Sequence, residues 1–171
     1  MTGRERKIWS AVLYLIPNAK KRAEFMKKKG LYGSIGENCS IQKRKLPLYS
    51  NLIFIHDNVK IASNVGFVTH DIIHKMLNEK YKGKEEFVER IGCIEIGNNV
   101  FIGSGTRILY DTRIGNNVII GSDSLVNKDV PDNSVVVNGE MKIINKNKNL
   151  DNRFIKIISG EEYYFDFDLM S

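Results

Sequence analysis

A six-residue repeat limits how this chain can fold more than any other feature of its sequence. From residue 96 to residue 131 the units read IGNNVF, IGSGTR, ILYDTR, IGNNVI, IGSDSL and VNKDVP, and each begins with an aliphatic residue. A period of six fits neither an α-helix nor an alternating strand of a meander. It predicts a parallel β-helix, in which short strands stack coil upon coil and the aliphatic position points inward. We expect the Gly-Asn and Asn-Asn pairs at corners, because Gly and Asn tolerate positive φ best.

A weaker copy of the repeat lies upstream. IGENCS begins at Ile35, KRKLPLYSN interrupts the pattern, and IHDNVK, IASNVG and FVTHDI resume it from Ile55. Residues 71–91 then break the repeat, and this polar segment is too long for a corner. We therefore predict a loop that leaves the prism after THD, and long loops of this kind are often functional. Together with the interrupting segment 42–54, it is expected to shape the pocket of a substrate.

The remaining segments suggest one domain with a helical start. Residues 4–16 and 18–29 predict two short helices, with Asn18 as an N-cap and Gly30 as a stop. These helices are expected to cover the open end of the prism. The predicted division is a helical cap over 1–30, a β-helix over 31–145 with its excursion loop, and a tail over 146–171.

Charge and cysteine content narrow the classes of protein further. The net charge is +6, with the excess in residues 1–45, whereas the tail segment SGEEYYFDFDLMS is acidic. A basic face next to an apolar helix indicates a membrane surface, a nucleic acid, an anionic cofactor or simply a solvated face. Nucleic acid is the least favoured, because no binding motif accompanies the charge. With no export signal and only two cysteines, we expect a cytoplasmic protein with reduced thiols.

Three stretches carry a resemblance to a known family. IEIGNNVFIGSGT and IGNNVIIGSDSLVNKDVP resemble the hexapeptide-repeat acyltransferases, in the branch of the maltose, galactoside and nodulation-type O-acetyltransferases. IASNVGFVTHDIIHK is further similar to the polysaccharide O-acetyltransferases of that branch. The resemblance implies an all-β, left-handed parallel β-helix, and a homotrimer with acetyl-CoA in the groove between neighbouring prisms. The left hand comes from the family alone, since parallel crossovers are otherwise right-handed.

The same resemblance places His70 at the position of the catalytic base. A hydroxyl is a poor nucleophile until a base removes its proton, and histidine suits this task because its unperturbed pKa of about 6.5 lies near neutral pH. The alternative is a corner histidine that is hydrogen-bonded to a backbone carbonyl. Asp71 is a weaker candidate for orienting His70, because orienting groups are usually adjacent in space and not in sequence.

The resemblance also implies which residues bind acetyl-CoA, the co-substrate. An aromatic residue would flank the reactive end, backbone groups at two corners would meet the pantetheine arm, and polar or basic residues would lie near the phosphates: Phe101, Ser104, Ser122, Asn127, Lys128 and Lys142. An ammonium group is a good point charge for phosphate. One departure stands beside Lys142: relatives close the prism with Gly-x-Pro-x-Lys, whereas this chain has NGEMK, with Glu140 in place of proline. This departure bears on donor affinity.

The prediction is an O-acetyltransferase that acts on a hydroxyl of a sugar or of a polysaccharide or glycoconjugate precursor, by direct transfer in a ternary complex and without a metal. An N-acetyltransferase that acts on an amino sugar or a xenobiotic remains an alternative. A second alternative is a zinc site like that of the γ-class carbonic anhydrases, built from His56, His70 and His74. A third is a non-catalytic β-helix subunit. The basic, apolar N-terminal helix also suits weak peripheral contact with a membrane.

Overall fold

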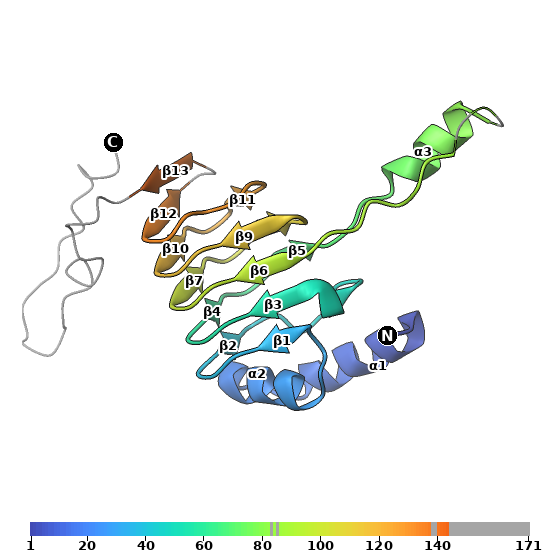
Figure 1. The fold of residues 1–171 in the computed structure, drawn as a ribbon. Helices are drawn as coiled ribbons and strands as arrows, with labels where there is room; N and C mark the ends of the chain where they lie inside the picture. The colour runs from blue at the N-terminus through green and yellow to red at the C-terminus, as the bar shows by residue number, and fades with distance from the viewer. Residues whose placement is uncertain (83, 85, 138–139, 144–171) are drawn as a thin grey trace, which may run out of the picture.

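Three narrow sheets of parallel strands form the faces of a prism in this computed structural model, which describes residues 1–82, 84, 86–137 and 140–143 (Figure 1). The first sheet contains β1 (Ser34–Ile35), β3 (Ile53–Ile55), β6 (Ile94–Ile96) and β9 (Thr112–Ile114). The second contains β2 (Ser40–Ile41), β4 (Lys60–Ile61), β7 (Val100–Ile102), β10 (Val118–Ile120), β12 (Ser134–Val137) and β13 (Glu140–Ile143). The third contains β5 (Gly66–Val68), β8 (Arg107–Leu109) and β11 (Leu125–Val126).

The strands are stacked with the spacing that the repeat predicts. The chain visits the three sheets in turn, and Val100 of β7 pairs with Val118 of β10, so one coil takes three six-residue units. β13 is the exception, because it returns antiparallel to β12. The parallel architecture and the similar proteins described below fit a left-handed β-helix. The predicted tail, residues 146–171, lies outside the described residues, and the division of the chain into three segments remains a prediction.

The first position of each repeat unit fills the core, as predicted. All six side chains are buried, with exposed fractions between 0 and 3%: Ile96, Ile102, Ile108, Ile114, Ile120 and Val126. Full burial of an aliphatic side chain contributes about 1.5–3 kcal/mol. The small residue four positions later is buried as well, and the hydroxyls of Thr106 and Ser124 donate to the carbonyl oxygen of Gly121. The repeat therefore provides both the apolar stack and the hydrogen bonds of its polar members.

Three lines of corners run along the prism, and we name them by a residue type of each. The asparagine edge joins the first sheet to the second, the serine edge joins the second to the third, and the histidine edge joins the third to the first. The asparagine edge consists of Asn38, Asn58, Asn99, Asn117 and Asn133 and their neighbours, all five with φ between 53° and 58°. The side-chain amide of each of the first four donates to the next asparagine at 2.9–3.0 Å. The predicted use of asparagine at corners is confirmed.

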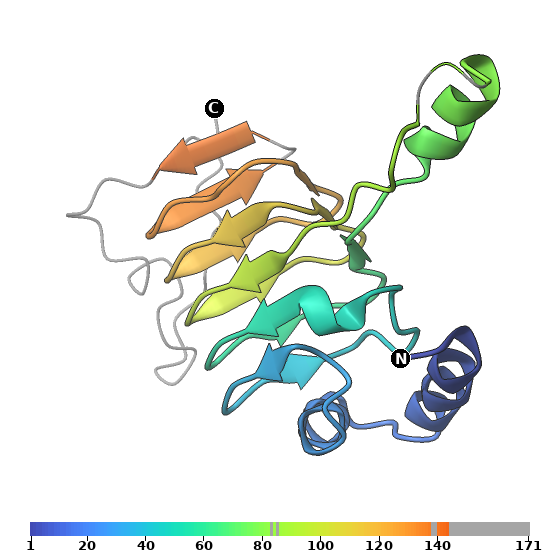
Figure 2. The same cartoon turned by 45° about the vertical axis from the view of Figure 1, so that its right-hand side comes forward.

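Two helices cover the first coil, as the sequence predicts (Figure 2). α1 (Gly3–Tyr14) begins at Thr2, which forms a capping box with Glu5. α2 (Ala19–Lys28) begins at Asn18, whose side chain accepts a hydrogen bond from the backbone of Lys21 at 3.0 Å. The helices protect the backbone groups at the end of the prism from pairing with another chain.

Arg22 of α2 ties this helical cap to the first coil. The guanidinium is completely buried, and its nitrogens donate to five carbonyl oxygens, at Leu13, Ile16, Pro17, Ile41 and Gln42. Three of these oxygens lie at or beyond the end of α1, where the negative end of the helix dipole favours a cation. Burial lowers the pKa of Arg22, and the nearby charge of Arg44 lowers it further. In the described part of the chain no carboxylate pairs with Arg22, so the carbonyl dipoles compensate the buried positive charge.

The excursion differs from its prediction, because part of it is helical. α3 (Ile73–Lys80) begins shortly after the end of β5 and extends away from the prism in both views (Figures 1 and 2). The carboxylate of Asp71 accepts a hydrogen bond from the amide of Ile73, and the side chain of Asn78 bonds both backbone groups of Phe87. These contacts stabilise a helical turn in a segment that the sequence predicts to be a loop. None of the helices in the described part of the chain is long and apolar enough to cross a membrane.

Candidate active site

His70 lies on the histidine edge, where β5 ends and the excursion leaves the prism. Its backbone pairs with Ile91 of the returning segment in an antiparallel bridge, and the amide of Gly92 donates to the carbonyl of Thr69 at 3.0 Å. The imidazole is half-buried, and its Nδ1 atom is buried without a hydrogen-bond partner among the described residues. Unpartnered buried nitrogens are rare in proteins and need an explanation. The backbone of His70 is thus firmly held while its ring remains free for chemistry.

Tyr49 forms one wall of this site. Its ring meets that of His70 edge to face, with 5.4 Å between the ring centroids and 81° between the planes. The Tyr49 hydroxyl donates to Glu89 of the excursion at 2.9 Å, and this hydrogen bond raises the pKa of the phenol. The backbone of Tyr49 has φ 52°, which is a left-handed conformation. All other described non-glycine residues with positive φ are Asn or Asp. Strain of this kind is characteristic of functional sites.

Asp71 is directed to Tyr110 and to the start of the excursion, and not to His70. Its carboxylate accepts hydrogen bonds from the hydroxyl of Tyr110 at 2.7 Å and from the amide of Ile73 at 3.0 Å. These two bonds, the phenol first, hold the pKa of Asp71 below its usual value. Among the described residues Asp71 forms no hydrogen bond with His70, so the structure does not bring together the pair that we considered for orienting the base.

The three histidines do not form a common site. His74 lies in α3, outside the prism, and so it does not stack on His56 in the next coil. His56 lies on the asparagine edge, where its Nε2 atom is 3.0 Å from Glu95. No cluster of three or more His, Cys, Asp or Glu side chains that could hold a metal occurs in the residues that the structure describes. The described residues therefore do not support the alternative of a zinc site built from His56, His70 and His74.

The serine edge brings together part of the predicted acetyl-CoA site. Ser104 and Ser122 are exposed and lie in successive coils, and the amide of Asp123 donates to the carbonyl of Ser104 at 2.7 Å. Gly103 makes this approach possible, because a Cβ atom there would lie 2.4 Å from the backbone nitrogen of Ser122. Phe101, 46% exposed, lies on the adjoining strand β7. This arrangement is an exposed surface with two small corner residues and one large apolar side chain.

The other predicted donor residues lie elsewhere. Asn127 and Lys128 are exposed on the histidine edge, directly after β11. They are two coils from His70, or about 10 Å at the usual spacing of strands. The third sheet separates them from Ser104 and Ser122. The backbone of Lys142 is part of β13, but its side chain lies outside the described residues.

Tyr49, Glu89 and Tyr110 were not among the residues predicted from sequence. The only signals were that Tyr49 interrupts the early repeat, and that Tyr110 stands where the neighbouring units have a polar residue, in ILYDTR. Their proximity to the histidine edge depends on how the coils stack, because Tyr49, His70 and Tyr110 come from three successive coils.

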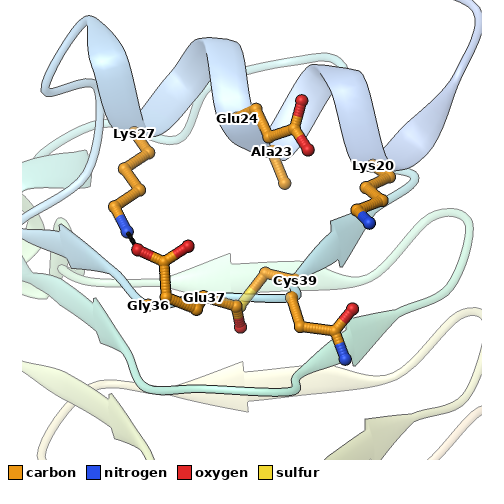
Figure 3. A pocket seen from close by; sticks show the side chains of 8 residues that line it. Lys20, Ala23, Glu24, Lys27, Gly36, Glu37 and Cys39 are labelled. Atoms are coloured by element: carbon orange, nitrogen blue, oxygen red, sulfur yellow. Dashed lines mark hydrogen bonds and ion pairs between the residues drawn. The ribbon is translucent and has the colours of Figure 1, made fainter.

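A separate pocket of about 340 Å³ lies between α2 and the first corner of the asparagine edge (Figure 3). Lys27 of α2 forms an ion pair with Glu37 across its mouth, and Cys39 forms part of its floor. Burial raises the pKa of the Cys39 thiol, which is 4% exposed and hydrogen-bonded to the carbonyl of His56 at 3.1 Å. Cys39 therefore fills the core, and a thiol of this kind is unreactive.

Comparison with known proteins identifies the repeat. Residues 93–128 match the bacterial transferase hexapeptide family, six repeats. A maltose O-acetyltransferase from Clostridium difficile 630 is similar in structure with a TM-score of 0.55 and 27% identity, over 82% of this chain and 85% of that one. The resemblance to the hexapeptide-repeat acetyltransferases is confirmed.

Two further structures share the hexapeptide-repeat acetyltransferase fold. A hexapeptide-repeat-containing acetyltransferase from Vibrio cholerae has a TM-score of 0.58 and 19% identity, over 84% of this chain and 91% of that one. A galactoside acetyltransferase in complex with coenzyme A has a TM-score of 0.60 and 23% identity, over 95% of this chain and 87% of that one. A comparison with curated protein sequences finds no significant match.

Proposed function

We propose that this chain is an acetyl-CoA-dependent O-acetyltransferase, that its acceptor is a hydroxyl of a sugar or glycoconjugate precursor, and that His70 is the general base. The acyltransferase class and the donor are supported by the hexapeptide-repeat match and by the similarity to the maltose O-acetyltransferase. The observation that carries the role of His70 is its position at the mouth of the excursion, where its backbone pairs with Ile91 and its ring packs against Tyr49.

The reaction moves one proton in two transfers, both through His70, and needs no covalent enzyme intermediate. The imidazole of His70 takes the proton from the acceptor hydroxyl as its oxygen attacks the thioester carbonyl. The tetrahedral intermediate then collapses, the carbon–sulfur bond breaks, and the imidazolium returns the proton to the sulfur of coenzyme A. The rings of Tyr49 and His70 pack edge to face, and this contact restricts the orientation of the imidazole. A base with a pKa near the working pH accelerates such a step by about 10²–10⁴-fold.

The donor would lie along the serine edge. Phe101 is exposed beside Ser104 and Ser122, and it would pack against the reactive end of acetyl-CoA while the backbone at the two serines meets the pantetheine arm. Lys128 and Lys142 would supply positive charge to the phosphates, with Asn127 as a polar neighbour. The glutamate in the segment NGEMK reduces the positive charge there, so we expect a donor affinity lower than that of relatives with proline at this position.

A homotrimer is supported by the separation of these two groups of residues. In one chain the third sheet lies between Ser104 and Ser122 on the serine edge and His70 on the histidine edge. A donor bound at the serine edge of one prism would meet the base on the histidine edge of a neighbouring prism. Three prisms side by side would form three such sites.

Peripheral contact with a membrane is supported by the surface of the helical cap. Ile8 of α1 is 53% exposed and Leu15, just beyond the end of the helix, is 81% exposed, in a segment rich in lysine and arginine. An apolar strip with basic flanks suits an anionic membrane surface. Sedimentation with vesicles that contain phosphatidylglycerol, at low salt, tests this proposal, and a protein that stays in the supernatant would refute it.

The proposed base is tested with His70→Ala and with His74→Ala as a matched control. His70→Ala should lower kcat for acetyl transfer to a sugar by about 10²–10⁴-fold and leave the binding of acetyl-CoA unchanged. His74→Ala removes a histidine four residues away, in α3, and should retain wild-type turnover. Release of coenzyme A is followed with a thiol reagent and binding by calorimetry. Activity retained in His70→Ala would sink the assignment.

A further inference from the structure

A basic pocket of about 760 Å³ opens on the serine edge beside the first two coils. Its walls include Lys43, Arg44 and Lys45 from the first coil, Arg107 from the third, and Tyr14 of α1. No acidic side chain lines it in the described part of the chain. Within the described residues, none of these four basic side chains forms an ion pair. The pocket therefore concentrates positive charge that this part of the protein does not neutralise.

Arg107 is held in place by the backbone of two corners. Its Nη1 atom donates to the carbonyl oxygens of Asn64 at 2.9 Å and Gly105 at 2.7 Å. A Cβ atom at Gly66 would lie 2.5 Å from the Cδ atom of Arg107, so the glycine leaves the room in which the side chain lies. Only one of the three guanidinium nitrogens is used in this way among the described residues. The other two can donate to a ligand, and a guanidinium fork matches the oxygens of a phosphate.

Lys43 is held by a backbone carbonyl in a similar way, whereas Arg44 has a buried donor without a partner in the described part of the chain. The ammonium of Lys43 is half-buried and donates to the carbonyl of Val65 at 2.8 Å. Its pKa is lowered by burial, and further by the charges of Arg107 and Lys45. The Nε atom of Arg44 is buried and has no hydrogen-bond partner in the described residues. Mutual repulsion between cations and an unpartnered buried donor both raise the energy of the free protein, and an anion in the pocket would relieve both.

The pocket lies at the same level of the prism as His70. Gly66, which lines it, begins β5, and His70 stands four residues later on the same outward side, with Val68 between them. At a rise of about 3.3 Å per residue the two are about 13 Å apart. A sugar ring and the phosphate groups attached to it can cover that length. The proposed donor residues Ser104 and Ser122 belong to the third and fourth coils of the same edge. Neither lines the pocket, in which Arg107 is the one described residue from the third coil, so the pocket adjoins the proposed donor surface on the side of the first coil.

We propose that this basic pocket binds a phosphate or diphosphate group carried by the acceptor, so that the enzyme acetylates a phosphorylated sugar in preference to a neutral one. Four basic residues around one cavity suit the charge of a diphosphate better than that of a single carboxylate. The inference rests on the proposed function, because it assigns the acceptor of the same site. The phosphate could belong to a soluble nucleoside diphosphate sugar or to a sugar diphosphate carried by a lipid.

The anion site is tested without catalysis, by calorimetric titration of the full chain with inorganic pyrophosphate at low salt. Binding should occur once per chain and should persist when coenzyme A is saturating, because the two sites are separate. Arg44→Gln and Lys43→Gln should each weaken it at least tenfold. Arg113→Gln is the control, since this arginine is exposed on β9, outside the pocket, and should bind as the wild type does.

Three results would overturn the proposal: no binding of pyrophosphate, competition between pyrophosphate and coenzyme A, or equal binding by the wild type and the two pocket variants. The variants are checked for folding by their affinity for coenzyme A and by light scattering. An unchanged value in both measurements excludes a general loss of structure.

Acetyl transfer then separates this proposal from the proposed function. A hexose, its 1-phosphate, a uridine diphosphate hexose and a polyprenyl diphosphate hexose in vesicles are compared by their kcat/KM. The phosphorylated acceptors should be preferred at least tenfold, Arg44→Gln should abolish the preference, and the KM for acetyl-CoA should not change. The better of the last two acceptors identifies the source of the phosphate. Equal use of the neutral hexose would refute the assignment of the pocket to the acceptor and leave the proposed function intact. Pyrophosphate binding without any acetyl transfer would refute the proposed function and leave the anion site intact.

Discussion

Replacing Arg22 tests how the helical cap is attached to the prism. In Arg22→Met the side chain keeps much of its apolar length but loses all donors to the five carbonyl oxygens. Two of these, at Leu13 and Ile41, are buried with the guanidinium, and each buried acceptor left without a partner costs about 1–3 kcal/mol. The other three are partly accessible and can bond to water. Methionine no longer requires the burial of a charge, which offsets part of the loss. We expect a decrease of about 2–4 kcal/mol in the free energy of unfolding.

The measurement is urea unfolding followed by circular dichroism at one fixed protein concentration, because assembly would make stability depend on concentration. Arg22→Lys keeps the charge, but an ammonium has three donors and cannot reach all five oxygens, so we expect an intermediate loss. Lys21→Ala is the control. It changes the neighbouring residue of α2, whose side chain is exposed, and should cost less than about 0.5 kcal/mol.

The reasoning fails if Arg22→Met unfolds at the urea concentration of the wild type, or if Arg22→Lys is fully stable. The first result would mean that water replaces the guanidinium at no cost. The second would mean that the charge alone matters, and not the fork geometry that allows one side chain to bond five oxygens.

Three further predictions concern the site. Lys128→Ala should raise the KM for acetyl-CoA about tenfold, as expected for one charge-assisted hydrogen bond, and leave the acceptor KM unchanged in steady-state kinetics. Tyr49→Phe keeps the aromatic ring beside the candidate base and should lower kcat only a few-fold, whereas Tyr49→Ala should lower it at least tenfold; equal values would refute the positioning role. The pKa of Asp71 is lowered by the phenol of Tyr110, so its carboxylate stabilises the fold above its ordinary pKa of 3.8 and loses this effect as the pH falls through its lower folded value. Thermal unfolding should therefore separate Asp71→Asn from the wild type at pH 7 and bring the two together in strong acid.

The excursion shows why a short helix escaped prediction. Ile73, Met76 and Leu77 have helical spacing, but the segment is short, and Ile72 at its start is not a capping residue. Isolated helices of this length are marginal, and tertiary contacts decide whether they form. Here the Asp71 carboxylate and the Asn78 side chain supply contacts of this kind, and neither can be inferred from periodicity.

The sequence by itself determined the prism. A strict period of six, with an aliphatic residue at one position and Asn or Gly at the corners, allows few other ways to bury every aliphatic side chain and satisfy every corner. The same repeat placed His70 at the end of a coil, because the pattern stops there.

Only the tertiary structure decided which side chains meet around that histidine. Residues 43–45, 66 and 107 line one pocket, and Tyr49, His70 and Tyr110 share one edge, because stacking brings together residues that are far apart in the chain. The long interruptions at 42–52 and 71–91 change the number of residues in the first coils. The repeat alone therefore cannot predict which residues line the pocket or which side chains surround His70. The chain's periodicity specifies a face of the prism for each residue, but the stacking of irregular coils selects its neighbours.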